Sequence, residues 1–127
     1  MNTYIIGLGS NLEPGKNIVM AKTMIAQKFK VLAESKFVQT KPVGLANQPD
    51  FINGALLIES ELSPPALRDY LKEIERNLGR QRSFPKDGPR TIDLDLIVCN
   101  DKVVDQDFYE RDFVKAAVLE LSPQVKY

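Results

Sequence analysis

The sequence of 127 residues contains no histidine, a single cysteine, and equal numbers of basic and acidic residues, 17 of each. Without histidine, imidazole acid–base catalysis and histidine metal sites are excluded, so any metal ion must be bound through oxygen ligands. The lone thiol, Cys99, cannot form an internal disulfide. We therefore expect it to serve as a small apolar side chain in a reducing, cytoplasmic environment.

Neither a surplus of one charge sign nor a long apolar run is present. A net charge of zero gives no argument for binding nucleic acid or an anionic membrane surface. No segment approaches the roughly 18 apolar residues of a membrane span, and the N-terminal MNTYIIGLGSN lacks the basic start of a signal peptide. We expect small-molecule substrates, no nucleic-acid or membrane partner, and a monomer.

The length suits one domain, residues 1–127, with a single core. Hydrophobic periodicity and turn residues predict a first set of elements: a strand at 3–10, a helix after Pro14, an extended stretch at 30–39, a loop at 40–50 and a strand at 51–60. In the first helix, one face carries the apolar residues Ile18, Ala21, Ile25 and Phe29.

The clearest element is a helix over residues 63–79. Ser63 is a good N-cap and Pro64 fits the first helical position, while Gly79 suits the position just past the end. Its apolar stripe consists of Leu67, Leu71, Ile74 and Leu78.

The remaining segments complete an α+β pattern. A second loop covers 80–90, a strand follows at 91–98, and residues 114–123 are either a short helix or a final strand. The order βαββαβ predicts a ferredoxin-like sandwich, with helices packed on a mainly antiparallel sheet.

Two carboxylates interrupt the strand at 91–98. Asp93 and Asp95 lie on one face, with Cα atoms about 6.6 Å apart, while Ile92, Leu94 and Leu96 point to the other face. Two adjacent carboxylates repel and need a cation between them, either Mg²⁺ with phosphate oxygens or basic side chains. The pattern therefore suits a metal–phosphate site, and the alternative is a solvated strand face paired with lysines.

Basic residues crowd the loop that precedes this strand: Arg80, Arg82, Lys86 and Arg90. Guanidinium groups bind phosphate oxygens bidentately and stabilise the charge that develops in phosphoryl transfer, so a nucleotide-triphosphate site is plausible. The alternative is that these arginines merely neutralise the aspartates. Glu75, on the helix that leads into the loop, either contacts the nucleotide or lies on an exposed surface.

A second polar group surrounds the strand at 51–60. Phe51 and Asn53 share one face, where an aromatic ring and an amide can hold a planar heterocycle. Thr40 and the backbone around Val43, on the predicted preceding loop, add polar contacts. Near the N-terminus, GLGSN lacks the features of a Walker A loop, so Gly7, Gly9 and Ser10 are predicted to form a tight turn after the first strand.

Four segments of the chain together resemble the 6-hydroxymethyl-7,8-dihydropterin pyrophosphokinase family of folate biosynthesis. In sequence order they are GLGSNL (7–12), TKPVGLANQPDFINGA (40–55), LKEIERNLGRQR (71–82) and GPRTIDLDLI (88–97). The resemblance implies a ferredoxin-like fold. It also implies transfer of the β,γ-diphosphoryl group of ATP to the hydroxymethyl group of the pterin, with release of AMP.

The resemblance also implies roles for individual residues. Asp93 and Asp95 become ligands of two Mg²⁺ ions that bridge the phosphates of the co-substrate ATP. The remaining implied roles are as follows: Arg80 and Arg90 are catalytic and bind ATP, Arg82, Arg111 and Glu75 contact ATP, Phe51 and Phe113 sandwich the pterin, and Thr40, Asn53 and the Val43 backbone hydrogen-bond to it.

The chain departs from the family pattern after the aspartate strand. Relatives usually have a longer segment there, with a Pro-His pair that contacts ATP, whereas this chain has VVDQDFYERDF (103–113). An aromatic residue usual near the adenine is replaced around Asp87, and Phe84 is one candidate to substitute for it. These departures motivate an alternative, a catalytically weakened relative that serves as a pterin- or nucleotide-binding module. A nucleotidyltransferase is disfavoured because the Gly-Ser and Asp-x-Asp motifs of such enzymes lie close together in sequence, whereas Ser10 and Asp93 are far apart in this chain.

Overall fold

The computed structural model describes residues 1–42, 47–79 and 91–127. The elements, in chain order, are β1 (Asn2–Ser10), α1 (Pro14–Lys28), β2 (Lys30–Glu34), β3 (Val38–Thr40), β4 (Phe51–Ser60), α2 (Pro64–Asn77), β5 (Asp93–Cys99), β6 (Lys102–Val103), α3 (Asp107–Glu110) and α4 (Asp112–Leu121).

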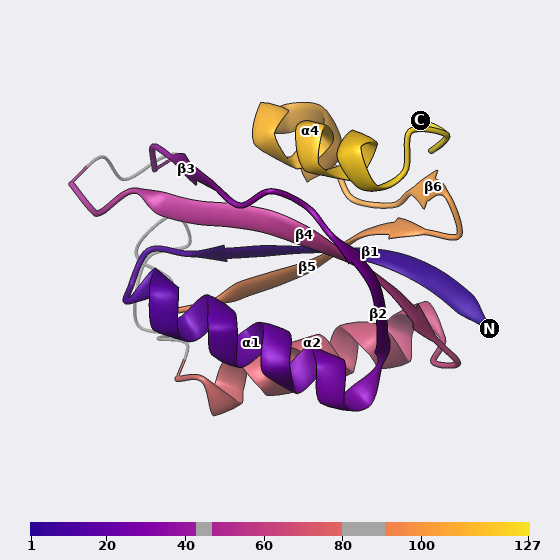
Figure 1. Cartoon of the computed structure of the whole chain (residues 1–127), viewed down its shortest axis with the longest axis horizontal. Helices are drawn as coiled ribbons and strands as arrows, with labels where there is room; N and C mark the ends of the chain where they lie inside the picture. The colour runs from indigo at the N-terminus through magenta and orange to yellow at the C-terminus, as the bar shows by residue number, and fades with distance from the viewer. Residues whose placement is uncertain (43–46, 80–90) are drawn as a thin grey trace.

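The strands form one sheet in the order β2-β4-β1-β5-β6, and β3 pairs with β4 beyond the end of β2. All of these strand pairs are antiparallel. Figure 1 shows α1 and α2 on one side of the sheet and α4 on the other. The predicted ferredoxin-like α+β fold is therefore confirmed. Of the two alternatives for residues 114–123, the structure has the helix, which begins earlier, at Asp112.

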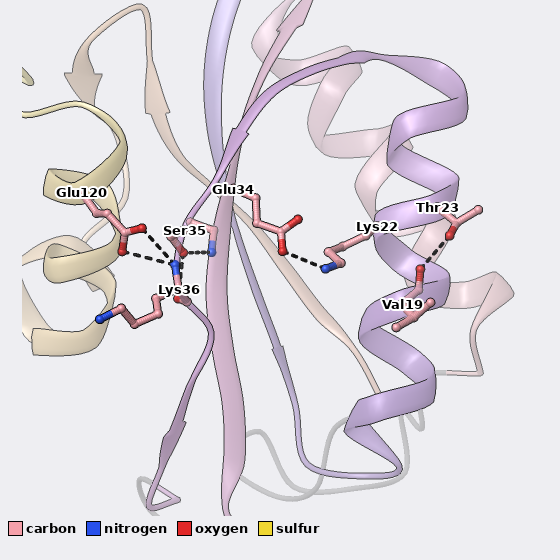
Figure 2. A network of polar contacts seen from close by, with 8 residues as sticks. Val19, Lys22, Thr23, Glu34, Ser35, Lys36 and Glu120 are labelled. Atoms are coloured by element: carbon pink, nitrogen blue, oxygen red, sulfur yellow. Dashed lines mark hydrogen bonds and ion pairs between the residues drawn. The ribbon is translucent and has the colours of Figure 1, made fainter.

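Residues 30–39 do not form the continuous extended stretch that was predicted. The strand breaks after Glu34, and Ser35 spans the break: its N–H donates to the carbonyl of Ala55 (2.9 Å) and its hydroxyl accepts the Ala55 N–H (2.8 Å). The next N–H, that of Lys36, donates to the carboxylate of Glu120 on α4 (3.0 and 3.2 Å; Figure 2). Helix α4 is thus attached to the junction of β2 and β3.

The face under α1 and α2 holds the larger apolar core. The predicted helix stripes are confirmed, since the apolar side chains of both helices pack against strand residues such as Tyr4, Ile6 and Leu94. Ser63 caps α2 by accepting the N–H of Ala66, at 3.4 Å. The buried helix residues of this core are Ile18, Ala21, Ile25, Leu67, Leu71 and Ile74, and Phe29 joins them just after α1. Cys99 packs at its edge, partly exposed and with a free thiol.

The opposite face has a smaller core under α3 and α4. It consists of Ile5, Ala55, Ile97, Val98, Phe108, Ala117, Val118 and Val125. The isolated bridge between Lys102 and Lys126 places the end of the chain beside β6, so α4 runs from the β3 side of the sheet towards β6 (Figure 1). No helix in the described ranges combines the length and apolar character needed to cross a bilayer.

Candidate active site

The two aspartates lie on the first half of β5, on the face of the sheet opposite α1 and α2. Their pairing partners on β1 are glycines: Asp93 lies beside Gly9 and Asp95 beside Gly7. Leu94 and Leu96 are buried in the larger core, whereas both aspartates are partly exposed. The predicted division of this strand into an acidic and an apolar face is confirmed.

The surroundings of the Asp95 carboxyl group disfavour its charged form. Burial raises its pKa well above the usual range, and the nearby carboxylates of Asp93, Asp105, Asp107 and Glu75 raise it further. No lysine of the described ranges pairs with Asp95; the ion pairs between described residues are Lys22–Glu34 and Arg76–Glu73. A cation bound beside Asp95 would stabilise the charged form of this carboxyl group.

The oxygen atoms of the two aspartates fit a hard divalent cation that takes most of its ligands from other molecules. Asp93 and Asp95 offer oxygen atoms alone, which suits Mg²⁺. Among the described residues, no group of three or more Asp, Glu or Cys is arranged to enclose a metal ion. Such an ion would therefore need oxygen ligands from phosphate or water, as Mg²⁺ commonly does in phosphoryl-transfer sites.

The predicted heterocycle-binding residues lie on the same face of the sheet, two strands away. Thr40 pairs with Phe51, and Asn53 pairs with Gly9 of β1. The amide nitrogen of Asn53 donates to the hydroxyl of Thr40 at 2.6 Å. Thr40 is the last residue of β3, so its predicted place on a loop is wrong: pairing with β4 extends the strand to this residue. The Val43 backbone lies outside the described residues.

The strand order brings the two groups of side chains together. Residues paired in an antiparallel ladder point to the same face, so Asn53, Gly9 and Asp93 form a row across β4, β1 and β5. Neighbouring strands are about 4.8 Å apart, so the Asn53 and Asp93 backbones are separated by roughly 10 Å. Residues more than 30 positions apart in sequence thus lie on one continuous surface.

The GLGSN segment does not form the tight turn that was predicted. Gly7, Gly9 and Ser10 all belong to β1. This strand pairs with β5 as far as Gly9 and with β4 as far as Ser10. Among the described glycines, the one with a positive φ is Gly79, at +81°. The glycines of β1 are therefore not there for unusual backbone angles; they remove side chains from the surface between Asn53 and the aspartates.

Ser10 and Asn11 have a role that the sequence did not reveal. The Ser10 hydroxyl donates to the carbonyl of Thr91 at 2.6 Å, and the Asn11 amide donates to Gln48 (2.7 Å) and to the carbonyl of Pro49 (3.0 Å). Both side chains are buried. They attach the end of β1 to the chain just before β4 and just before β5. The available signal was two small polar residues directly after an apolar strand.

Glu75 is buried, with 5% of its surface exposed, so the alternative of an exposed surface role is wrong. Its carboxylate accepts the backbone N–H of Leu94 at 2.8 Å. The face of α2 that carries Leu71 and Ile74 packs on β5. Glu75 lies beside that face, so its side chain reaches the edge of the strand. Since Leu94 lies between the two aspartates, Glu75 fixes the backbone that carries them.

A cavity of about 140 Å³ lies between α2 and the edge of β5, adjacent to Asp95. Its walls combine apolar side chains with charges of both signs: Arg68, Leu71, Lys72, Glu75, Leu94, Asp95, Leu96 and Asp105. A polar cavity that opens beside the acidic pair can accept another part of a ligand whose phosphates lie at the aspartates.

The last two predicted residues lie where α4 begins. Arg111 is the N-cap residue and Phe113 is in the first turn, and both side chains are partly buried. Burial raises the pKa of Asp107, with a further contribution from Asp105, while Arg111 lowers it, so the guanidinium lies near this acidic side chain. Contacts of Arg111 with phosphate and of Phe113 with a heterocycle remain predictions.

The predicted arginines Arg80, Arg82 and Arg90 lie outside the described residues. The positions that flank their segment are close together, because the Thr91 hydroxyl donates to the carbonyl of Gly79 at 3.3 Å. The chain just after α2 is therefore close to the residue that lies two positions before Asp93.

Comparison with known proteins shows the family to which this chain is similar. Residues 5–123 match the model of the family described as 7,8-dihydro-6-hydroxymethylpterin-pyrophosphokinase (HPPK). Three similar proteins are each named 2-amino-4-hydroxy-6-hydroxymethyldihydropteridine pyrophosphokinase. Identity is 35% to the Haemophilus influenzae protein (96% of this chain, 82% of the relative), 38% to that of Campylobacter jejuni (78% and 64%), and 31% to that of Bacillus subtilis (98% and 81%).

The matched region begins within β1 and extends through α4, so it contains all of the candidate site residues. The chain belongs to the 7,8-dihydro-6-hydroxymethylpterin-pyrophosphokinase family.

Proposed function

We propose that this protein transfers the β,γ-diphosphoryl group of ATP to 6-hydroxymethyl-7,8-dihydropterin, giving the pterin diphosphate and AMP, a step of folate biosynthesis. The family membership supports this activity. The observation in the structure that supports it is the row of Asn53, Gly9 and Asp93, since the Asn53 amide and the acidic pair share one surface.

Asp93 and Asp95 are the proposed ligands of Mg²⁺, and the family resemblance implies two ions. Bound Mg²⁺ would supply positive charge that neutralises phosphate oxygens. The raised pKa of Asp95 supports this assignment, because its cause is burial together with the nearby negative charges of Asp93, Asp105, Asp107 and Glu75. Neither aspartate needs to move a proton in this role.

The pterin is proposed to bind over β4. Asn53 has a second N–H and a carbonyl oxygen with which to read the edge of the ring, and its bond to Thr40 orients the amide. Phe51 and Phe113 are proposed to stack on the two ring faces, with the Val43 backbone as a further polar contact. Stacking contributes affinity and the amide contributes selectivity.

In the reaction, the pterin hydroxyl oxygen forms a bond to the β-phosphorus while the bond from that phosphorus to the α,β-bridging oxygen breaks. The bridging oxygen leaves with AMP, and the hydroxyl proton passes to water. Arg80 and Arg90 are proposed to stabilise the charge that develops on the phosphoryl oxygens, with Arg82 and Arg111 binding the polyphosphate. Holding both substrates in line supplies much of the rate enhancement.

The nucleoside part of ATP is proposed to enter the cavity between α2 and β5. This cavity begins beside Asp95, so a triphosphate at the aspartates can extend into it. Lys72 and Arg68 add positive charge at its wall. Glu75, predicted to contact ATP, lines the same cavity while it holds Leu94 in place.

The test is to incubate the purified protein with ATP, Mg²⁺ and the reduced hydroxymethylpterin, and to measure AMP and pterin diphosphate. We expect both products in equal amounts and only when all three components are present. Binding of both substrates without AMP formation would instead favour the catalytically weakened relative. ADP as the product would contradict diphosphoryl transfer.

A further inference from the structure

Gly9 is packed unusually closely against Asn53. A Cβ atom placed on Gly9 would lie 2.5 Å from the side-chain oxygen of Asn53, a distance that real Cβ atoms do not tolerate. Gly9 lies near the end of β1, where it is paired on both sides, and needs no positive φ. A glycine in such a place marks a close approach of another group to the backbone, and here that group is the Asn53 amide.

The Asn53 side chain reaches toward both neighbouring strands. Its nitrogen reaches the Thr40 hydroxyl on β3, at 2.6 Å, while its oxygen lies over Gly9 on β1. The amide therefore spans from one neighbouring strand to the other. It can keep both ends in place because position 9 has no side chain.

The same absence keeps the path to the aspartates open. Gly9 pairs with Asn53 on one side and with Asp93 on the other, so a bulky side chain at position 9 would stand between them. The two flanking backbones are roughly 10 Å apart, a distance that the hydroxymethyl arm and the phosphoryl group must occupy during transfer.

We propose that Gly9 is a positioning residue for the pterin: it lets the Asn53 amide lie between Thr40 and β1, in the orientation that reads the ring. This inference rests on the proposed function. It assigns to Gly9 a role in selecting the heterocyclic substrate, although Gly9 itself contacts no reacting atom.

The first test is Gly9→Ala. The clash falls on the far end of a flexible side chain, so Asn53 rotates away and the fold survives. Loss of an oriented hydrogen bond should raise the KM for the pterin by about tenfold. The KM for ATP and the midpoint of thermal unfolding should stay close to those of the wild type, a pattern that a general structural defect would not produce.

A double-mutant cycle with Asn53→Ala isolates the mechanism. Removing the Asn53 side chain removes the clash, so Gly9→Ala should have little further effect on pterin KM in that background, within about twofold. The matched control is Gly7→Ala, on the same face of the same strand. A Cβ there meets Ile97 at 3.4 Å, an ordinary contact, so its pterin KM should remain within about twofold of wild type.

Three results would overturn the inference. The first is an unchanged pterin KM in Gly9→Ala; the second is an equal penalty in the wild-type and Asn53→Ala backgrounds; the third is an equal penalty from Gly7→Ala. In each case a wild-type protein that still makes AMP leaves the proposed function intact. A wild-type protein that neither forms AMP nor binds the pterin, measured by fluorescence titration, overturns both.

Discussion

The two faces of the sheet are built from the same strands but have opposite characters. On β5, Leu94 and Leu96 enter the core under α1 and α2, while Asp93 and Asp95 point the other way. The first face is covered along its length by two amphipathic helices. The second carries a smaller core and a row of polar side chains and glycines.

This difference shows how a small domain separates stability from chemistry. Strand alternation lets one segment contribute to both, because successive side chains leave the sheet on opposite sides. The helix face supplies the burial energy, so the other face can keep carboxylates that repel one another. Substitutions at adjacent positions of β5 should therefore have effects of different kinds.

The largest expected effect is the loss of activity in Asp95→Asn. The amide keeps the size of the side chain but loses the negative charge that is proposed to hold Mg²⁺, so AMP formation should fall by roughly a thousandfold or more. Steady-state assays over a range of Mg²⁺ concentrations measure this. Turnover within tenfold of wild type would rule out the metal-binding role.

Leu94→Ala, one position earlier, should act on stability. Leu94 is 6% exposed in the larger core, and truncation of a buried leucine costs about 2–5 kcal/mol of unfolding free energy. Urea unfolding measures the loss. Activity per folded molecule, assayed well below the unfolding midpoint, should remain far above that of Asp95→Asn. Equal inactivity of the two variants would contradict the proposed division between a stabilising face and a catalytic face.

Glu75 joins the two faces, since it reaches from α2 to the backbone between the aspartates. Glu75→Leu leaves the Leu94 N–H without this acceptor, so it should cost about 1–3 kcal/mol and raise the Mg²⁺ concentration needed for half-maximal activity. Glu75→Gln keeps an acceptor oxygen and should restore most of both. Equal defects in the two variants would show that the charge, and not the hydrogen bond, matters.

The smallest expected effect is on the stability of the metal-free protein. The pKa of Asp95 is raised in the folded state, so the folded protein binds a proton more readily than the unfolded chain. Its charge therefore destabilises the fold at neutral pH, and this penalty disappears as the pH falls through the raised pKa towards the ordinary value.

In EDTA at pH 7, Asp95→Asn should be more stable than wild type by roughly 1 kcal/mol, and the difference should shrink on acidification. Thermal unfolding of both proteins from pH 7 down to pH 4 measures this. Added Mg²⁺ should stabilise wild type alone. A variant less stable than wild type at pH 7 would show that Asp95 already has a compensating partner.

Local sequence patterns were sufficient for much of this description. The stripe of α2, its Ser63 cap and the alternation on β5 depend on contacts within one element, so their periodicity is visible in the sequence. The prediction that Gly7 and Gly9 form a turn was wrong because a glycine in a strand and a glycine in a turn look alike without the pairing partner. The burial of Glu75 depended on packing between α2 and β5.

The sequence by itself determined which residues are the candidates for the chemistry: an acidic pair on one strand face, an aromatic and an amide on another, and arginines between helix and strand. Tertiary structure decided which of them meet. Strand order placed β1 between β4 and β5, and pairing register aligned Asn53, Gly9 and Asp93. Register and order arise from packing of the whole sheet against its helices, which no local pattern encodes.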